Sequence, residues 1–167
     1  MIKKRDLSVS EYITNALFEL MEGKPYSQIS ITEITSKADV HRVSFYRCFS
    51  SKEEIITKWI RKTTDDFLGN SNISYTTDCL EDYFLKLFTH LENYKNRSKL
   101  INQANQIHLL KNEFDYVFMK SYKQNYDSYK SYFISGGIFN IYYYWLINDF
   151  KESAKELSLK LVDLLTK

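Results

Sequence analysis

A helix-start signal recurs along this chain and constrains its fold more than any other feature. At four places a serine is followed three residues later by a glutamate, at or just before an apolar pattern of helical period: Ser8–Glu11, Ser30–Glu33, Ser51–Glu54 and Ser153–Glu156. In such a capping box the hydroxyl and the carboxylate satisfy free backbone N–H groups at the start of a helix. The sequence therefore predicts an all-α protein.

Composition agrees with this fold class. The 167 residues include one proline and four glycines, too few for many tight turns, and 44% are hydrophobic, enough to fill a core. No apolar run approaches the roughly 18 residues of a membrane span. Residues 1–12 lack the apolar segment of a secretory signal, and Cys48 and Cys79 lack motif spacing. We expect a cytoplasmic protein with reduced thiols and no membrane contact.

Two short helices joined by a tight turn follow the first helix. The first helix ends at Gly23, and the apolar spacing then predicts helices over about 31–37 and 41–48 with a turn over 38–40. A helix, a second short helix, a turn of three or four residues and a third helix form a helix-turn-helix unit. The net charge of +2 indicates no partner by itself, so any basic surface must be local.

The third of these helices would present a surface suited to DNA. Val40, Phe45 and Phe49 are its inward anchors, which leaves five side chains facing outward: Arg42, Val43, Ser44, Tyr46 and Arg47. The major groove admits a helix, and cations, hydroxyls and apolar groups contact its base edges and phosphates. The alternative is an ordinary amphipathic helix-loop-helix of a helical protein.

Residues of about 8–55 resemble the DNA-binding domain of the tetracycline-repressor (TetR) family. The likeness lies in ISITEITSKADVHRVSFYRCFSSKEEII, where the segments SFY (44–46) and FSSKEEI (49–55) follow the family pattern closely. Two positions depart from the pattern. Asp39 replaces the usual turn glycine, although aspartate tolerates the left-handed conformation, and Val43 stands where a small residue is common.

The resemblance implies a role for each matching position. Arg42 and Val43 would touch base edges, and Ser44 and Tyr46 would touch backbone phosphate. Lys52 would bind phosphate at the start of the fourth helix. The full DNA-binding set that we expect is Thr32, His41, Arg42, Val43, Ser44, Tyr46, Arg47 and Lys52. The chain would then be a transcriptional repressor on a palindromic operator in double-stranded DNA. A helical sensor or interaction protein with a degenerate DNA-reading unit is the alternative.

The last two helices predict a dimer. Gly136 and Gly137 precede or interrupt a helix that is apolar nearly all round, and an amphipathic helix begins at Ser153. This region resembles the dimerisation element of TetR regulators, in particular a subgroup near the dihydroxyacetone-kinase regulators. We expect a homodimeric four-helix bundle of about residues 136–166, with an interface of Ile138, Ile141, Tyr142, Trp145, Leu157, Leu161 and Leu164. Alternatively, these helices close the core of one chain.

Aromatic residues are abundant, with 14 tyrosines and 11 phenylalanines. Aromatic walls with hydroxyl tips suit a small apolar or aromatic effector, and the resemblance implies that an effector would release the operator. The candidate ligand-binding residues are Tyr83, Phe84, Phe88, Tyr122 and Tyr126. Two alternatives stay open: the aromatics fill a helical core, or the regulator responds to a protein partner without a small-molecule effector.

The sequence offers no recognisable catalytic or metal-binding motif. It has no glycine-rich phosphate loop, no cysteine pair with zinc spacing and no H-E-x-x-H, and His41, His90 and His108 are scattered. We therefore expect no enzyme, no cofactor and no metal site. The domain organisation that we expect is a helix-turn-helix DNA-binding domain over 1–50, a connecting helix over 51–70 and a helical effector-binding and dimerisation domain over 71–167.

Overall fold

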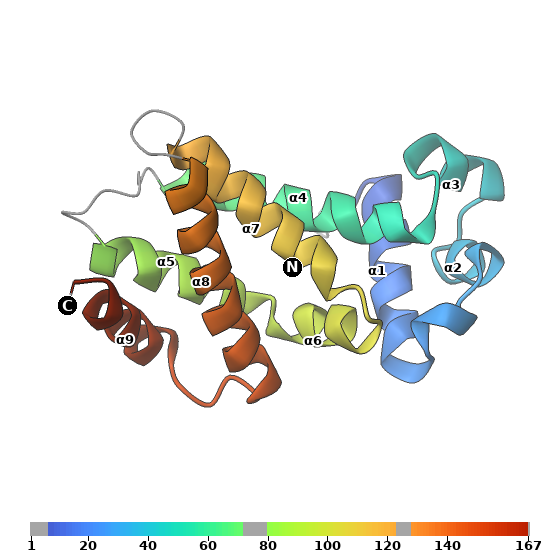
Figure 1. The fold of residues 1–167 in the computed structure, drawn as a ribbon. Coiled ribbons are helices and arrows are strands. Elements are labelled where there is room, and N and C mark those ends of the chain that lie inside the picture. Colours follow the sequence, from blue (N-terminus) through green and yellow to red (C-terminus); the bar gives the residue numbers. More distant parts are fainter. Residues whose placement is uncertain (1–6, 72–79, 123–127, 167) are drawn as a thin grey trace, which may run out of the picture. The chain divides into compact units, whose positions relative to one another are not determined.

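The protein is helical throughout the part that the structure, a computed structural model, describes. This part comprises residues 7–71, 80–122 and 128–166 (Figure 1). It contains nine α-helices, one 3₁₀ helix and no strand, so the predicted all-α class is confirmed. The chain divides into two compact units, Met1–Ile60 (unit 1) and Arg61–Lys167 (unit 2).

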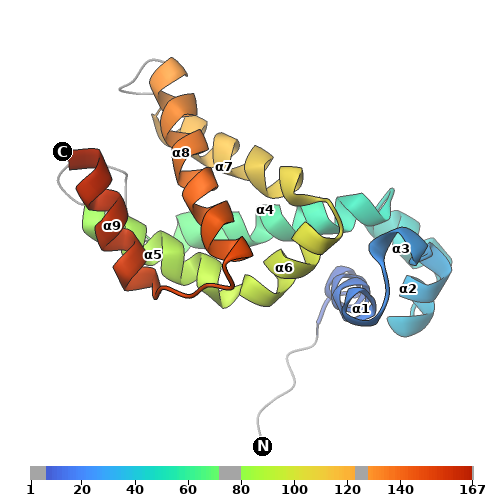
Figure 2. The same cartoon turned by 60° about the horizontal axis from the view of Figure 1, so that its bottom comes forward.

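Unit 1 is a cluster of three helices with the start of a fourth. Its elements are α1 (Val9–Gly23), η1 (Tyr26–Gln28), α2 (Ile31–Lys37), α3 (Arg42–Cys48) and the first part of α4 (Lys52–Ser71). Helices α1, α2 and α3 pack against one another, as both views show (Figures 1 and 2). Their core is apolar, and the ring of Phe18 in α1 meets Trp59 in α4 edge-on, with centroids 5.0 Å apart.

Three of the four predicted capping boxes form in full. At Ser8, Ser30 and Ser153 the hydroxyl accepts a hydrogen bond from the N–H of the glutamate three residues on. The glutamate carboxylate in turn accepts from the serine N–H. These reciprocal bonds satisfy N–H groups that a helix start leaves free, so they determine where α1, α2 and α9 begin.

The box predicted at Ser51 forms only in part. The Ser51 hydroxyl accepts from the Glu54 N–H at 3.1 Å, as expected. The Glu54 carboxylate, however, accepts from the backbone N–H of Ser50 at 2.6 Å and also from the Ser50 hydroxyl. The prediction that the Glu54 carboxylate accepts from the N–H of Ser51 is therefore wrong. The carboxylate is bonded to the preceding residue, Ser50, because Ser50 offers it two donors.

Unit 2 is a bundle of longer helices. Besides the rest of α4 it contains α5 (Leu80–Asn93), α6 (Lys95–Gln103), α7 (Ile107–Tyr122), α8 (Ser128–Ile147) and α9 (Ala154–Thr166). Helix α5 packs along α9, and α7 packs along α8 (Figures 1 and 2). Aromatic rings dominate the core, with Phe84, Phe88, Phe118, Tyr142 and Trp145 among its largest buried side chains.

Helix α8 runs through Gly136 and Gly137 without a break, which corrects the expectation that this pair precedes or interrupts a helix. A glycine inside a helix costs about 1 kcal/mol relative to alanine. Buried neighbours on both sides of the pair, Ile134 and Ile138, favour continuation of the helix. Within residues 7–71, 80–122 and 128–166, α8 included, no helix has both the length and the apolar content that a membrane crossing needs.

Candidate nucleic-acid interface

The turn between α2 and α3 closes through local backbone bonds. The N–H of Ala38 donates to the carbonyl of Ile34 at 2.9 Å, and that of Val40 donates to Thr35 at 3.0 Å. Between them Asp39 has a φ of 53°, the left-handed conformation expected of a residue in place of the usual glycine. The helices over 31–37 and 42–48 and their turn therefore match the sequence-based expectation to within one residue.

Helix α3 has one buried and one exposed face. Phe45 and Phe49 are buried, with ring centroids 6.0 Å apart, and Val40 is half-buried beside them. The opposite face holds the predicted DNA-binding residues of this helix. His41, Arg42, Val43, Tyr46 and Arg47 are exposed, and Ser44 is half-buried. The five exposed side chains thus point outward, whereas contact of any of these residues with DNA stays a prediction.

Two of the exposed residues form a pair. The Nη2 atom of Arg42 donates to the hydroxyl of Tyr46 over 3.2 Å, and the guanidinium carbon lies 5.7 Å from the centroid of the Tyr46 ring. The residues are four apart, so one turn of α3 places them on the same side. This contact restricts the rotamers of a long side chain that is otherwise in solvent.

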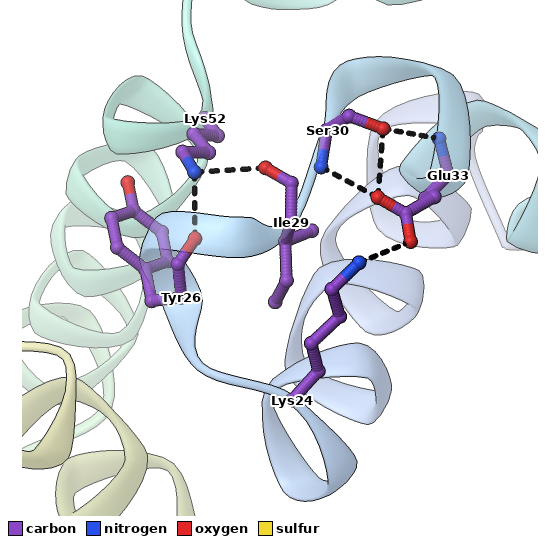
Figure 3. A network of polar contacts seen from close by, with 6 residues as sticks. All are labelled: Lys24, Tyr26, Ile29, Ser30, Glu33 and Lys52. Carbon is purple, nitrogen blue, oxygen red and sulfur yellow. Dashed lines mark hydrogen bonds and ion pairs between the residues drawn. The ribbon is translucent and has the colours of Figure 1, made fainter.

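Lys52, the predicted phosphate ligand of α4, has partners inside the protein (Figure 3). Its Nζ donates to the carbonyl of Tyr26 at 2.6 Å and to that of Ile29 at 2.8 Å. It also lies 4.4 Å from the centroid of the Tyr26 ring. Two of the three N–H donors of Lys52 are thus bonded within the protein, and phosphate binding by Lys52 stays a prediction. Thr32, on the first turn of α2, is exposed as expected.

An ion pair lies beside this contact. The Nζ of Lys24 is 2.5 Å from Oε1 of Glu33, while Oε2 of Glu33 closes the capping box with Ser30 (Figure 3). The hydrogen bond from Lys24, followed by those from the Ser30 backbone and hydroxyl, lowers the pKa of Glu33 to about 2. The start of α2 thus depends on an ionised carboxylate.

The candidate ligand-binding aromatics of α5 lie in the core of unit 2. Tyr83, Phe84 and Phe88 are buried, and the Phe88 ring meets Trp145 edge-on with centroids 5.8 Å apart. This arrangement matches the alternative that the aromatics fill a helical core. The side chain of Tyr122 and the whole of Tyr126 lie outside the described residues.

The residue assignment of the predicted dimer interface needs correction. Leu164 is exposed and Ile141 is half-buried, but the other five residues are buried within the single chain: Ile138, Tyr142, Trp145, Leu157 and Leu161. Side chains that are already buried have little surface left for a second copy. As the alternative interpretation held, these five close the core of one chain. The dimer itself stays a prediction.

Sequence reasoning missed a different apolar surface, the outer face of α8. It consists of five exposed side chains: Tyr129, Tyr132, Phe133, Tyr144 and Ile147. The spacing of Tyr129 to Phe133 and of Phe133 to Tyr144 is four and eleven residues, so these side chains share one side of the helix. Because α8 is apolar nearly all round, its sequence pattern did not show which side would be buried.

Comparison with known proteins points to one family. Residues 13–58 match the family model for bacterial regulatory proteins of the tetR family. A curated relative, the HTH-type dhaKLM operon transcriptional activator DhaS of Lactococcus lactis subsp. lactis (strain IL1403), is 32% identical over 72 residues. That match covers 43% of this chain and only 38% of the length of DhaS.

Solved structures share the fold over nearly the whole chain. The dihydroxyacetone kinase operon activator DhaS superposes with a TM-score of 0.66 at 19% identity, covering 94% of this chain and 93% of its own. The fatty acid degradation regulator FadR of Bacillus halodurans has a TM-score of 0.61 at 17% identity, with coverages of 97% and 96%. FadR of Bacillus subtilis, solved with stearoyl-CoA, has a TM-score of 0.61 at 18% identity, with coverages of 94% and 97%.

Proposed function

We propose that the protein is a transcriptional regulator that binds double-stranded DNA, a proposal supported by the match of residues 13–58 to the family model for bacterial regulatory proteins of the tetR family. The observation that carries the proposal is the exposed face of α3. Its cationic, hydroxyl and apolar side chains point outward while Phe45 and Phe49 are buried beneath them. A short helix displayed in this way can enter a major groove.

Each exposed side chain has a role suited to its chemistry. Arg42 can donate two hydrogen bonds to one guanine, and Val43 offers an apolar contact to a thymine methyl. Ser44 and Tyr46 carry hydroxyls for phosphate oxygens, Arg47 follows them on the same helix, and His41 is the N-cap of that helix. Thr32, on the first turn of α2, can contact the sugar-phosphate backbone of the DNA. The contacts of Arg42 and Val43 with bases select the DNA sequence, and the contacts with phosphates position the helix on the duplex.

We propose that the regulator acts as a homodimer. One helix-turn-helix unit reads only a short half-site, and two-fold dimers read palindromes. The outer face of α8 supplies a candidate surface, because exposed apolar patches of this kind on one protomer commonly mark a protein interface. Leu164 and Leu165 at the end of α9 are exposed as well. This proposal replaces the five buried residues of the sequence-based expectation.

Repression by operator occupancy, released by an apolar or aromatic effector in unit 2, is the mode of action that we propose. Support comes from the stearoyl-CoA complex of the similarly folded FadR. DhaS, by contrast, is a transcriptional activator. A reporter gene placed behind an operator that the protein binds distinguishes repression from activation. Expression of the reporter falls when the protein is a repressor and rises when it is an activator.

Selection from a random duplex pool tests DNA binding directly. The full chain is used to capture duplexes, and the enriched sequence is then compared with a scrambled duplex in a binding titration. We expect an enriched inverted repeat that binds more tightly than the scrambled duplex, with an affinity that falls steeply with salt. Equal affinity for both duplexes, or no enrichment, would contradict the proposal.

A further inference from the structure

The outer face of α8 continues through the middle of the helix, where it carries no bulky side chain. Between Phe133 and Tyr144, the residues on the same side of the helix are Gly137 and Asn140, and both are exposed. Along the stripe from Phe133 to Ile147, successive residues are four, three, four and three positions apart, so they form one narrow line. This alternation is the spacing at which one helix packs along another.

Among the described residues, no neighbour of the glycine pair in this stripe requires a glycine there. A Cβ atom added at Gly136 or Gly137 would meet no neighbouring heavy atom within 4 Å, and neither residue has a positive φ. Each glycine nevertheless costs the helix about 1 kcal/mol relative to alanine. What a glycine provides is a flat helix surface, which lets a second backbone come close.

Asn140 is a polar residue in the centre of an otherwise apolar stripe. Its side-chain amide carries two N–H donors and a carbonyl acceptor, so it can bond reciprocally to an identical amide. A single asparagine in an apolar helix seam fixes the register and the number of helices in an assembly. The stripe from Phe133 to Ile147 contains no charged residue, so two copies of it meet without electrostatic repulsion.

The exposed area of this face suits a protein interface. Tyr129, Phe133 and Tyr144 are 82%, 80% and 62% exposed, and Tyr132 and Ile147 are more than half exposed. Because one aromatic side chain has about 150–250 Å² of surface, the outer face of α8 presents on the order of 600 Å² on one protomer. A standard interface buries about 800 Å² per partner. The face therefore supplies most of the area that a stable dimer needs.

We propose that two copies of the protein cross at the middle of α8, with Gly136 and Gly137 at the point of closest approach and the two Asn140 side chains facing each other at the two-fold axis. The inference rests on the proposed homodimer and deepens it, because it identifies the residues that select the partner. A residue on a two-fold axis meets its own copy. The glycines bring the two backbones together, and the asparagine favours an identical helix over another apolar one.

Substitution of Gly137 separates an effect on the dimer from an effect on the protomer. Gly137→Leu should keep the helix content measured by circular dichroism, because leucine is the better helix former and has open space within the protomer. We expect the dimer dissociation constant to rise at least about tenfold, since the leucine holds the backbones apart. Sedimentation over a concentration series measures this constant.

Gly69→Leu is the matched control for this substitution. It makes the same change at an exposed glycine of α4 that also has open space around it, so the dissociation constant should stay at the wild-type value. An unchanged dissociation constant in Gly137→Leu would overturn the inference.

A cysteine at position 140 tests the place of the two-fold axis. In a background with Cys48→Ser and Cys79→Ser, Asn140→Cys should form a disulfide between protomers under mild oxidation, because bridged Cα atoms lie about 4.4–6.8 Å apart. Electrophoresis without reductant measures the cross-linked species. Asn112→Cys, at an exposed position of α7, is the control and should not cross-link. A dimer in which Asn140→Cys fails to cross-link has its axis elsewhere and would overturn the inference.

Failure of this inference can be told apart from failure of the proposed function. A wild-type chain that sediments as a monomer overturns both the crossing and the homodimer. A dimer that tolerates Gly137→Leu and does not cross-link through position 140 overturns the crossing alone. The selection of operator duplexes tests DNA binding without reference to α8.

Discussion

Arg42 donates a hydrogen bond to the hydroxyl of Tyr46, one turn further along α3, and its guanidinium also lies near the Tyr46 ring. The pair stands on the exposed face of a helix whose other face is anchored by Phe45. A side chain that is restricted before binding loses less entropy when it binds. The arrangement therefore gives the long Arg42 side chain a defined direction at the proposed DNA surface.

Removal of either partner should weaken operator binding without unfolding the protein. We expect Arg42→Ala to weaken binding by about 1–3 kcal/mol, the range for a good base contact, and Tyr46→Ala to weaken binding through the loss of a phosphate contact and of the hydrogen-bond partner of Arg42. Both positions are exposed, so the melting temperature should change little. Binding titrations and circular dichroism measure the two effects. Lys160→Ala, which removes an exposed cation of α9, is the control, and undiminished selective binding by both α3 variants would refute the proposed surface.

The two faces of α3 should respond differently to truncation. Phe45 is 0% exposed, and Phe45→Ala should lower the free energy of unfolding by about 3–5 kcal/mol. Val43 is 64% exposed, and Val43→Ala should change the free energy of unfolding by less than about 0.5 kcal/mol. Urea titration of both variants measures these effects. A large loss for Val43→Ala would mean that this face of α3 is packed.

The start of α2 should lose stability in acid. The pKa of Glu33 is lowered to about 2 from an ordinary value of 4.5, so the ionised carboxylate stabilises the folded state. That contribution is complete above pH 4.5 and declines as the pH falls toward 2, where the folded protein also takes up the proton. Glu33→Gln should therefore be less stable than the wild type at neutral pH, and the difference should shrink over this interval. Urea titrations at several pH values measure it, and a constant difference would contradict the assignment.

The outer face of α8 should control the oligomeric state. Phe133 is 80% exposed in the single chain, so Phe133→Glu should leave the protomer folded and shift a dimer toward monomer. The cause would be the desolvation of a charge at an apolar interface. Sedimentation at micromolar concentration measures the mass. Asn112→Glu, at an exposed position on α7, is the matched control. A wild-type protein that is already monomeric would refute the dimer, and an unchanged dimer in Phe133→Glu would place the interface elsewhere.

The helix-turn-helix could be read from the sequence because its signals are local. The capping box at Ser30 acts over three residues, and Asp39 marks the turn by its own backbone conformation. Phe45 and Phe49, four apart on and just after one short helix, then show which face is buried. Helix starts, a left-handed turn and the exposed side of α3 depend on neighbours within about one turn. The exposed side of α3 was therefore predictable from local sequence.

Contacts between distant residues decided the rest. Helix α8 is apolar on nearly every side, so only its packing against α7 and the other helices determined that Tyr142 and Trp145 are buried while Phe133 and Tyr144 are exposed. Lys52 was expected to bind phosphate because the family resemblance implies that role at the start of the fourth helix. Its partners, the carbonyls of Tyr26 and Ile29, come from more than twenty residues away. Local patterns carry no information on which distant backbone acceptors a folded chain brings to a side chain.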